Sequence, residues 1–290
     1  MIQLYDFEAT DLLAPKATQI GMCRLAKDYS LIKSSCKENY INPEKPISWG
    51  AMGLNDITNE MVAGKPTFEE VLPKFKVHPS TKYIVCHNMS FDSRFFPEGF
   101  IPEGVKLLCT LKLAKRLIPK VECDNHKNAT LYYYLGCYKN PFGKEYIDKT
   151  HTSLSDILMT ANVLTSLLET FDITIDEAYV IANDVTTCQF SKHKGEKWEE
   201  LVKVDYSYCE YLFNNVEWDN PDEKEYLEQL LKGNESIKEG QLKICSFKKY
   251  LNIPWKEVVA QDMSYVEWML SKGNIKGDEC SYVKGLLEEK

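Results

Sequence analysis

The first third of the chain alternates dense apolar segments with short polar turns, a pattern typical of β-strands. Strands are predicted over residues 2–8, 17–26 and 30–41, and their close spacing indicates an antiparallel meander. The apolar runs YIVC at 83–86 and KLLCT at 106–110 predict two further short, buried strands. A helical pattern follows each of these two. Strands first and then strand–helix alternation predict an α/β domain, with a mixed sheet covered by helices.

Capping residues and helical spacing place the helices. Thr67 and Glu70 predict a capping box at the start of a helix over 67–75. Further helices are predicted over 90–96, 111–118 and 129–136, the last ending on a glycine. The longest helix is predicted over 153–171, where apolar residues recur at helical spacing for almost five turns. At its start, Ser153 and Asp156 have the spacing of a second capping box.

Beyond about residue 184 the chain repeats itself. The segment FSKHKGEKWEELVKVDYSYCEYLF from Phe190 matches FKKYLNIPWKEVVAQDMSYVEWML from Phe247 at a constant offset of 57. This number of matches without a gap indicates two tandem copies of a unit of roughly 45 to 50 residues. We therefore expect three parts: a domain at 1–180 and two small α-rich modules at 187–233 and 243–290, the second of them divergent.

Composition narrows the classes of protein. The ten cysteines form no Cys-x-x-Cys pair, which argues against a zinc module or a disulfide scaffold and favours reduced thiols in a cytoplasmic protein. No signal peptide and no stretch of membrane-spanning length is present, so no membrane partner is expected. The formal net charge is −8, but residues 1–183 are nearly balanced, with 20 Lys+Arg against 22 Asp+Glu. The charge of this part is therefore compatible with a nucleic-acid partner, which it would bind with modest and salt-sensitive affinity.

Two acidic residues lie in the first predicted strand, MIQLYDFEAT. Asp6 and Glu8 are two positions apart, so their side chains point to the same face, roughly 6 to 7 Å from each other. Two carboxylates held that close in a buried site repel each other unless a positive charge lies between them. The alternative is a strand that frays into solvent at Asp6, with both acids hydrated.

Two further acids follow predicted strand or helix boundaries. Asp92 comes soon after the strand at 83–86, and Asp156 lies in the first turn of the longest helix, five residues after His151. Each has a simple structural explanation, Asp92 as a favourable charge near a helix N-terminus and Asp156 as the acid of the capping box. Four carboxylates at such positions together predict instead a shared site for hard divalent cations.

The segments DFEAT, HNMSFD and HTSLSD, which contain these four acids and His151, resemble the three motifs of the DEDDh 3′ to 5′ exonucleases. PISWGAMGLNDITNEMV, CTLKLAKRL and the order of elements are similar to the exodeoxyribonuclease X group of that family. The first C-terminal copy resembles the small domain attached to that group, so the similarity covers about residues 1–232. The resemblance implies a ribonuclease H-like fold, a five-stranded mixed sheet flanked by helices. It also implies an enzyme that releases nucleoside 5′-monophosphates from single-stranded or duplex DNA 3′ ends, in repair or nucleotide salvage.

The chemistry of these side chains supports such an activity. Two Mg²⁺ or Mn²⁺ ions about 3.5 to 4 Å apart activate the attacking water and stabilise the leaving oxygen of a phosphodiester. On this hypothesis Asp6 bridges both ions, Glu8 and Asp156 complete the site nearest the water, and Asp92 supports the other ion. His151 cannot share a helix face with Asp156 at a spacing of five, so we expect it in the preceding loop as the general base.

Three positions depart from the family pattern. Asp11 stands where glycine is usual, Gln19 where glutamate is common, and Asn55 where histidine is frequent. None of the three is a predicted metal ligand or base, so the departures are expected to change how the end of a strand is held rather than the reaction.

Residues beside the motifs are predicted to contact the substrate. This set is Phe7, Thr10, Asn88 and Phe91. The threonine and the two phenylalanines border the motifs and are predicted to contact the terminal base or sugar. For the two rings the alternative is packing in the core. The asparagine is predicted to orient the scissile end. Leu12 and Leu13, in the lengthened turn after the first motif, form an apolar wedge that separates a terminal base pair, or else pack beneath the turn.

The two C-terminal copies differ in charge along one loop. Lys192, Lys194 and Lys197 make the first copy locally basic, which predicts contact with nucleic acid. The second copy has Leu-Asn-Ile-Pro at 251–254, so we expect it to stabilise the module or to bind a protein. Two alternative functions stay open: an exoribonuclease, because nothing in the sequence reads a 2′-OH, and a catalytically idle scaffold that recruits partners through its tandem modules.

Overall fold

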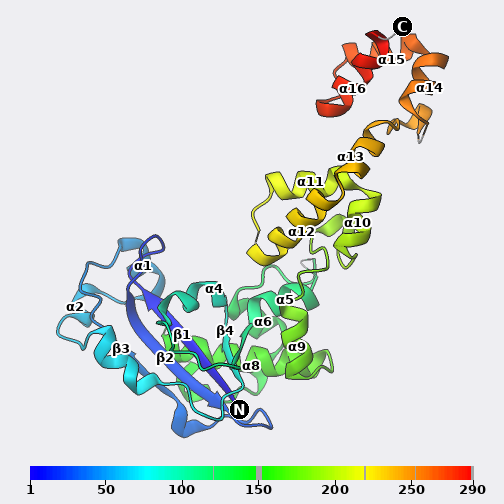
Figure 1. Cartoon of the computed structure of the whole chain (residues 1–290). Helices are drawn as coiled ribbons and strands as arrows, with labels where there is room; N and C mark the ends of the chain where they lie inside the picture. The colour runs from blue at the N-terminus through cyan, green and yellow to red at the C-terminus, as the bar shows by residue number, and fades with distance from the viewer. Residues whose placement is uncertain (120, 148–151, 219, 252, 289–290) are drawn as a thin grey trace. The chain divides into compact units, whose positions relative to one another are not determined.

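A computed structural model describes the chain except for residues 120, 148–151, 219, 252 and 289–290. The chain divides into two units, Met1–Asn183 and Asp184–Lys290 (Figure 1). None of the helices in the described part of the chain has the length and apolar content needed to span a bilayer.

The first unit is built on a five-stranded sheet with the strand order β3-β2-β1-β4-β5. The strands are β1 (Ile2–Ala9), β2 (Ala17–Leu25), β3 (Lys37–Tyr40), β4 (Tyr83–Cys86) and β5 (Lys106–Cys109). β2 runs antiparallel to β1 and β3, whereas β4 runs parallel to β1 and β5. The predicted mixed sheet is therefore confirmed, as is the antiparallel meander at its start.

The third predicted strand is shorter than the span 30–41. Lys33–Ser35 forms a 3₁₀ turn, and β3 begins only at Lys37. The cause is Ser35, whose hydroxyl donates to the Ile32 carbonyl at 2.6 Å and accepts from the Arg24 amide at 2.8 Å. These side-chain hydrogen bonds replace strand pairing at that point.

Nine helices are described in the first unit. They are α1 (Trp49–Asn55), α2 (Asn59–Val62), α3 (Phe68–Val71), α4 (Met89–Asp92), α5 (Thr110–Leu117), α6 (Asn128–Tyr134), α7 (Lys144–Ile147), α8 (Ser153–Thr170) and α9 (Ile175–Ala182). The predicted helices at 67–75 and 90–96 are each a single α-turn continued by a 3₁₀ turn. The capping signals are confirmed at Thr67, whose amide donates to Glu70 Oε2 at 2.8 Å, and at Gly136, which follows α6 with a φ of +73°.

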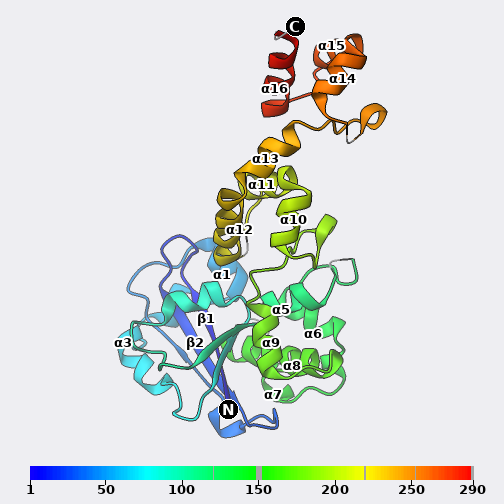
Figure 2. The ribbon, with the colours of Figure 1, turned by 45° about the vertical axis from the view of Figure 1, so that its right-hand side comes forward.

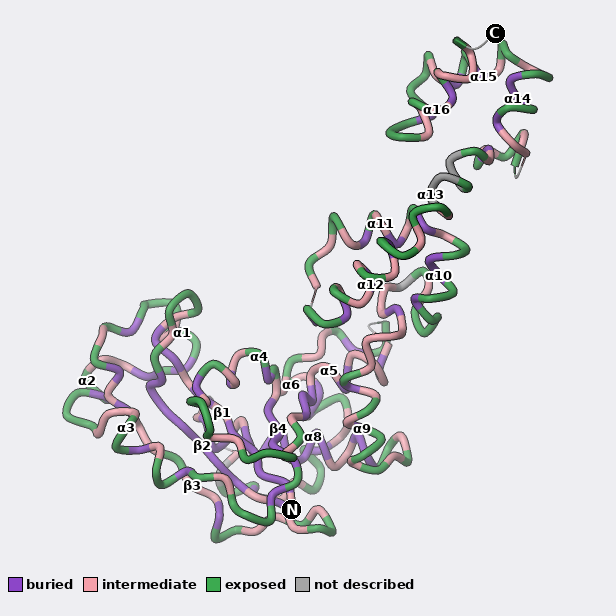
Figure 3. The backbone as a smooth tube through the Cα atoms, in the orientation of Figure 1, coloured by how far each residue is buried: buried purple, intermediate pink, exposed green. Residues whose placement is uncertain are grey.

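The side chains of β1 alternate between two hydrophobic cores. Ile2 and Leu4 pack with α5, α6, α8 and α9 on one face of the sheet, and Tyr5 and Phe7 pack on the opposite face with α3 and α4. Figure 2 shows α5, α6, α8 and α9 beside the sheet, and Figure 3 shows β1 and β2 as buried strands. Asp6 and Glu8 continue the even-numbered series, so they face α8.

Two residues of β2 bring the start of α8 close to β1. Gly21, which pairs with Asp6, has no side chain, and a Cβ there would lie 2.8 Å from the carbonyl carbon of Ser153. Gln19, which pairs with Glu8, accepts a hydrogen bond from the Ser153 amide at 2.9 Å. A side chain at position 21 would push the helix away from the two acids.

The second unit is helical and contains two separate hydrophobic cores. Its helices are α10 (Trp198–Val204), α11 (Tyr206–Asn215), α12 (Pro221–Gly233), α13 (Glu235–Leu242), α14 (Trp255–Gln261), α15 (Met263–Ser271) and α16 (Gly277–Glu288). One core lies within residues 188–231 and the other within 245–283.

Each of the two cores has a tryptophan at its centre. Trp198 and Trp255 are fully buried, and their indole N–H groups donate to Glu223 at 3.2 Å and to Glu279 at 2.9 Å. These matched interiors support the proposed division into modules at 187–233 and 243–290.

Candidate active site

Three carboxylates meet beside the carboxyl end of β1. Asp6 and Glu8 come from β1 and Asp156 from the first turn of α8, and each offers an oxygen within 4.8 Å of the other two. Asp6 Oδ2 is buried and has no hydrogen-bond partner within the described residues. A buried carboxylate oxygen without a donor is a poor arrangement for the protein alone, and a bound cation would satisfy it.

The fourth acid, Asp92, is buried at the end of α4. Its Oδ1 accepts a hydrogen bond from the backbone amide of Phe7 at 3.1 Å. Its charge contributes to the raised pKa of Asp6, so the two acids lie in one electrostatic site. The structure therefore gathers Asp6, Glu8 and Asp156, and it holds Asp92 against the backbone of the residue between Asp6 and Glu8.

Burial and mutual repulsion raise the pKa values of three of the acids. Burial raises the pKa of Asp6 well above its usual range, and the charges of Asp92, Glu8 and Asp156 add to this effect. Burial also raises the pKa of Glu8 to about 7, against a hydrogen bond from Asn55 that acts to lower it. Burial raises the pKa of Asp92 as well. A group of like-charged carboxylates that repel one another in a buried position is the set of oxygen ligands expected at a divalent metal site.

The start of α8 differs from the predicted capping box. Thr152 is the N-cap, because its hydroxyl accepts from the Ser155 amide at 3.2 Å, and the Ser153–Asp156 box is wrong. Asp156 is therefore not the acid of a capping box with Ser153. Asn128 holds the same turn by donating to the Asp156 carbonyl at 2.9 Å.

His151, the predicted general base, lies outside the described residues. Its role stays a prediction.

Two of the predicted substrate-binding residues, Phe7 and Thr10, have buried side chains. Phe7 is buried on the face of β1 opposite the acids and stacks on Phe95 with 4.9 Å between ring centroids, which favours the packing alternative. Thr10 is also buried, and its hydroxyl donates to Asp11 at 3.0 Å and accepts from the Lys16 amide at 3.1 Å. Both side chains are engaged within the fold, and substrate contact by these two residues stays a prediction.

The other two, Asn88 and Phe91, are accessible. Asn88 is exposed, has a φ of +71°, and accepts a hydrogen bond from the Ser90 hydroxyl at 2.9 Å. Phe91 is half-buried, and the Arg94 guanidinium lies 5.0 Å from its ring centroid. Both flank Asp92 in sequence and remain proposed substrate contacts.

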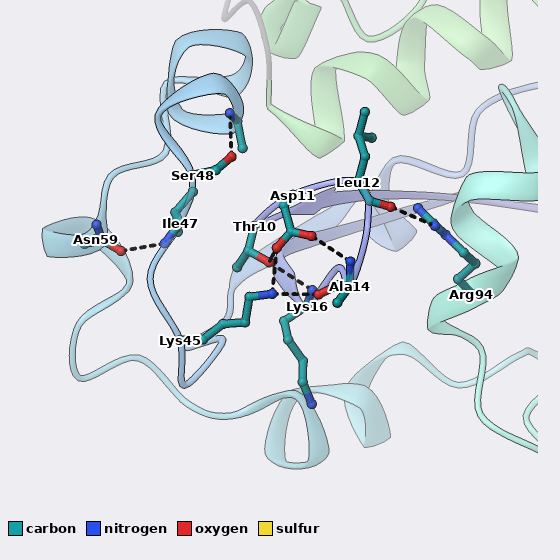
Figure 4. Close-up of polar contacts among 11 residues, drawn as sticks. Thr10, Asp11, Leu12, Ala14, Lys16, Lys45, Ile47, Ser48, Asn59 and Arg94 are labelled. Carbon is teal, nitrogen blue, oxygen red and sulfur yellow. Dashed lines mark hydrogen bonds and ion pairs between the residues drawn. The ribbon is translucent and has the colours of Figure 1, made fainter.

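The turn after β1 is held in shape from two other segments. Lys45 Nζ pairs with Asp11 at 2.6 Å, and Arg94 Nη1 donates to the Leu12 carbonyl at 3.1 Å, as Figure 4 shows. Leu12 and Leu13 are 74 % and 98 % exposed. This exposure contradicts the alternative in which the two leucines pack beneath the turn.

The sequence marks Asn55 only as a departure from the family pattern, and the structure gives it a function. Its Nδ2 donates to Glu8 Oε2 at 3.1 Å, while its Oδ1 accepts from the Ile57 amide at 3.1 Å. The side chain is buried at the end of α1 and orients the Glu8 carboxylate. No local pattern reveals this contact, because 47 positions separate the two residues.

Replacing Asn55 with Ala should weaken metal binding. A residue that orients a metal ligand typically contributes 10- to 100-fold to metal affinity. The predicted role of Glu8 as a ligand therefore implies that half-maximal activity requires about 10- to 100-fold more divalent metal. Metal titrations of the predicted activity measure this. Asn183→Ala, which removes an exposed hydrogen bond to the Tyr179 carbonyl, is the control. An unchanged metal requirement in Asn55→Ala would contradict the orienting role.

The predicted basic contacts of the first C-terminal module are partly used within the module. Lys192 pairs with Asp205 at 2.6 Å, and Lys197 Nζ donates to the Thr186 hydroxyl at 2.8 Å, while Lys194 is exposed. The second module has the equivalent pair, Lys249–Asp262, also at 2.6 Å. The recurrence of this ion pair gives Lys192 a structural role in the module.

The first unit has a mixed five-stranded sheet, with acids on β1, on α4 directly after β4, and on α8. This combination defines the class of ribonuclease H-like exonucleases. The chain belongs to the RNase_T exonuclease family, whose model matches residues 4–164. Within this DEDDh-type family it is similar to Exodeoxyribonuclease 10 of Escherichia coli (strain K12), with 32% identity over 186 residues, 63% of this chain and 78% of the relative.

Two further comparisons extend this result. The PolC-type DNA polymerase III of Clostridium perfringens (strain 13 / Type A) is 26% identical over 309 residues, which is 95% of this chain and 20% of the relative. The solved structure of Exonuclease X in complex with 5′ overhanging duplex DNA has a TM-score of 0.51 and 29% identity, covering 63% of this chain and all of that chain. The predicted family and fold class are confirmed. The protein is a hydrolase, an exonuclease that acts on nucleic acid, and its family depends on divalent metal.

Proposed function

We propose that the protein is a 3′ to 5′ exonuclease that hydrolyses phosphodiester bonds at DNA ends and releases nucleoside 5′-monophosphates. The observation that carries this proposal is the meeting of Asp6, Glu8 and Asp156 within 4.8 Å, around a buried oxygen without a donor. Similarity to Exodeoxyribonuclease 10 supports DNA as the substrate.

The proposed cofactors are two Mg²⁺ or Mn²⁺ ions. Asp6 would hold both, Glu8 and Asp156 would complete one site, and Asp92 would support the other. When bound, such ions activate water and neutralise the charge that develops on the phosphate. The set of carboxylate oxygens suits these hard cations and disfavours zinc.

The remaining residues act by position and proton transfer. His151 is proposed to take the proton of the attacking water, since a neutral imidazole is the side chain best suited to that role near neutral pH. Asn55 orients Glu8, and the Phe7 backbone amide orients Asp92. Asn88 is proposed to contact the scissile end.

The test is digestion of 5′-end-labelled single-stranded DNA, duplex DNA and RNA of one sequence by the full chain, with Mg²⁺, Mn²⁺ or EDTA. We expect DNA to shorten from its 3′ end and to yield mononucleotides with 5′-phosphates. Faster digestion of RNA would favour the exoribonuclease alternative. Binding without cleavage under every metal condition would favour the idle scaffold.

The exposed Leu12–Leu13 turn predicts a difference between substrates. Replacing both leucines with Ala should slow digestion of blunt duplex DNA at least about 5-fold. An apolar wedge offsets part of an unstacking cost of a few kcal/mol per base step, and about 1 kcal/mol is a factor of about five in rate. Digestion of single-stranded DNA should be unchanged, since no base pair has to be separated. Val180→Ala, at an exposed apolar residue of α9, is the control. Equal rates on blunt duplex for the double variant and the parent would exclude a wedge.

A further inference from the structure

The two C-terminal modules expose an aromatic ring at the same position. Tyr211 on α11 and Trp268 on α15 are separated by 57 residues, the offset that relates the copies, and are 59 % and 51 % exposed. Neither ring belongs to the hydrophobic core of its module. Packing into the core of the module therefore does not account for the ring in either copy. A single exposed ring is common on protein surfaces, so the ring becomes informative only where further groups gather beside it.

In the second module this ring is part of a mixed aromatic and basic surface. It consists of Lys249, Tyr265, Trp268 and Lys272, here called the aromatic surface. The centroids of the Tyr265 and Trp268 rings are 6.1 Å apart, and Lys249 Nζ lies 4.6 Å from the Tyr265 centroid. Lys272 is exposed and follows Trp268 by one helical turn, which places it on the same side of α15.

An ion pair fixes the lysine over the tyrosine in both copies. Lys249 pairs with Asp262 at 2.6 Å in the second module, as Lys192 pairs with Asp205 in the first. Lys192 Nζ likewise lies 4.8 Å from the Tyr208 centroid. The cation–π contact is thus part of the frame of the module, so the rings are presented in a defined arrangement.

Charge distinguishes the two copies. Residues 243–290 contain eight Lys+Arg against seven Asp+Glu, whereas residues 187–233 contain six against eleven. An acidic surface repels a phosphate backbone, and a slightly basic one does not. The second module therefore suits a nucleic-acid strand better than the first, even though its loop at 251–254 has no lysine.

We propose that the aromatic surface of the second module binds single-stranded nucleic acid, with bases stacking on Trp268 and Tyr265 and with Lys272 near the backbone. This inference rests on the proposed function, because it takes nucleic acid as the substrate. Every base has an aromatic face, so binding is independent of sequence and weakens with salt. A strand held here has a higher effective concentration at the enzyme between cleavage events. The inference replaces the expectation that this module only stabilises the chain or binds a protein.

The test is fluorescence anisotropy of a labelled oligothymidylate with the full chain in EDTA, where no cleavage occurs. Trp268→Ala should weaken binding about 10-fold, because one stacked base contributes about 1 to 3 kcal/mol. Trp268→Phe keeps a ring and should retain most of the affinity. Tyr211→Ala, the equivalent change in the more acidic copy, is the matched control and should weaken binding less than about twofold. Thermal melts establish that each variant is folded.

Unchanged affinity in Trp268→Ala, or an equal loss in Tyr211→Ala, would overturn the inference and leave the surface to a protein partner. Cleavage of a labelled trinucleotide separates this result from the proposed function. Trp268→Ala should cleave it at the rate of the parent, since so short a strand needs only the carboxylate site. A chain that cleaves no nucleic acid but binds it through Trp268 would contradict the proposed function alone.

Discussion

Replacing Asp6 with Asn should lower the rate of nucleotide release at least about 10³-fold. Metal ions contribute several kcal/mol to such transition states, and each 1.36 kcal/mol is a factor of ten in rate. Asp6 shares the cluster within 4.8 Å with Glu8 and Asp156, and its buried Oδ2 has no hydrogen-bond partner within the described residues, so it is the proposed ligand of both ions. Single-turnover digestion of single-stranded DNA measures the loss.

The same substitution should stabilise the metal-free protein at pH 8. The amide side chain that it introduces carries no charge, so the repulsion between residue 6 and the other buried acids would be removed. A variant that is inactive and yet melts at a higher temperature in EDTA would show that the acid serves the metal and not the fold. Asp124→Asn, at an exposed acid of the same unit, is the matched control and should change neither quantity. Near-parental activity in the Asp6 variant would contradict the metal site.

Removing divalent metal should abolish activity and lower the stability of the protein in a pH-dependent way. The pKa values of Asp6, Glu8 and Asp92 are raised in the folded state, that of Glu8 from 4.5 to about 7. Between the pKa values of these acids in the unfolded chain and their raised values in the folded state, the metal-free folded protein therefore binds more protons than the unfolded chain. The contribution of these three acids to stability is fully present below about pH 4 and is lost as the pH rises through the raised values. A cation replaces the protons and restores that stability.

Thermal melts with EDTA or Mg²⁺ at pH 5.5 and pH 8 measure this effect. At an ion concentration about 30 times its dissociation constant the stabilisation is about 2 kcal/mol, or about 4 to 8 °C in Tm for a unit of this size. We expect most of this shift at pH 8 and little at pH 5.5, where protons compete with the ion. Asp6→Asn should show a much smaller shift at both pH values. The same shift at both pH values in the parent protein would contradict the linkage.

Features that depend on local periodicity can be predicted from the sequence. The alternation of side chains along a strand places Asp6 and Glu8 on one face of β1, and the structure confirms this position beside α8. Likewise, the offset of 57 residues predicts two similar modules, and two cores with equivalent central tryptophans are present. The prediction failed where a side chain competed with the backbone pattern, as Ser35 does in the third strand and Thr152 does at the start of α8.

The sequence by itself determined the order of elements, the pairing of two acids on one strand and the repetition of the C-terminal module, because each depends on neighbours within a few residues or on self-similarity. Only the tertiary structure decided that Asp156 reaches Asp6, since this requires Gly21 to leave room for α8. It also decided that Asn55 orients Glu8. These contacts join residues far apart in the chain, and their geometry follows from how the sheet and helices pack, which no local pattern specifies.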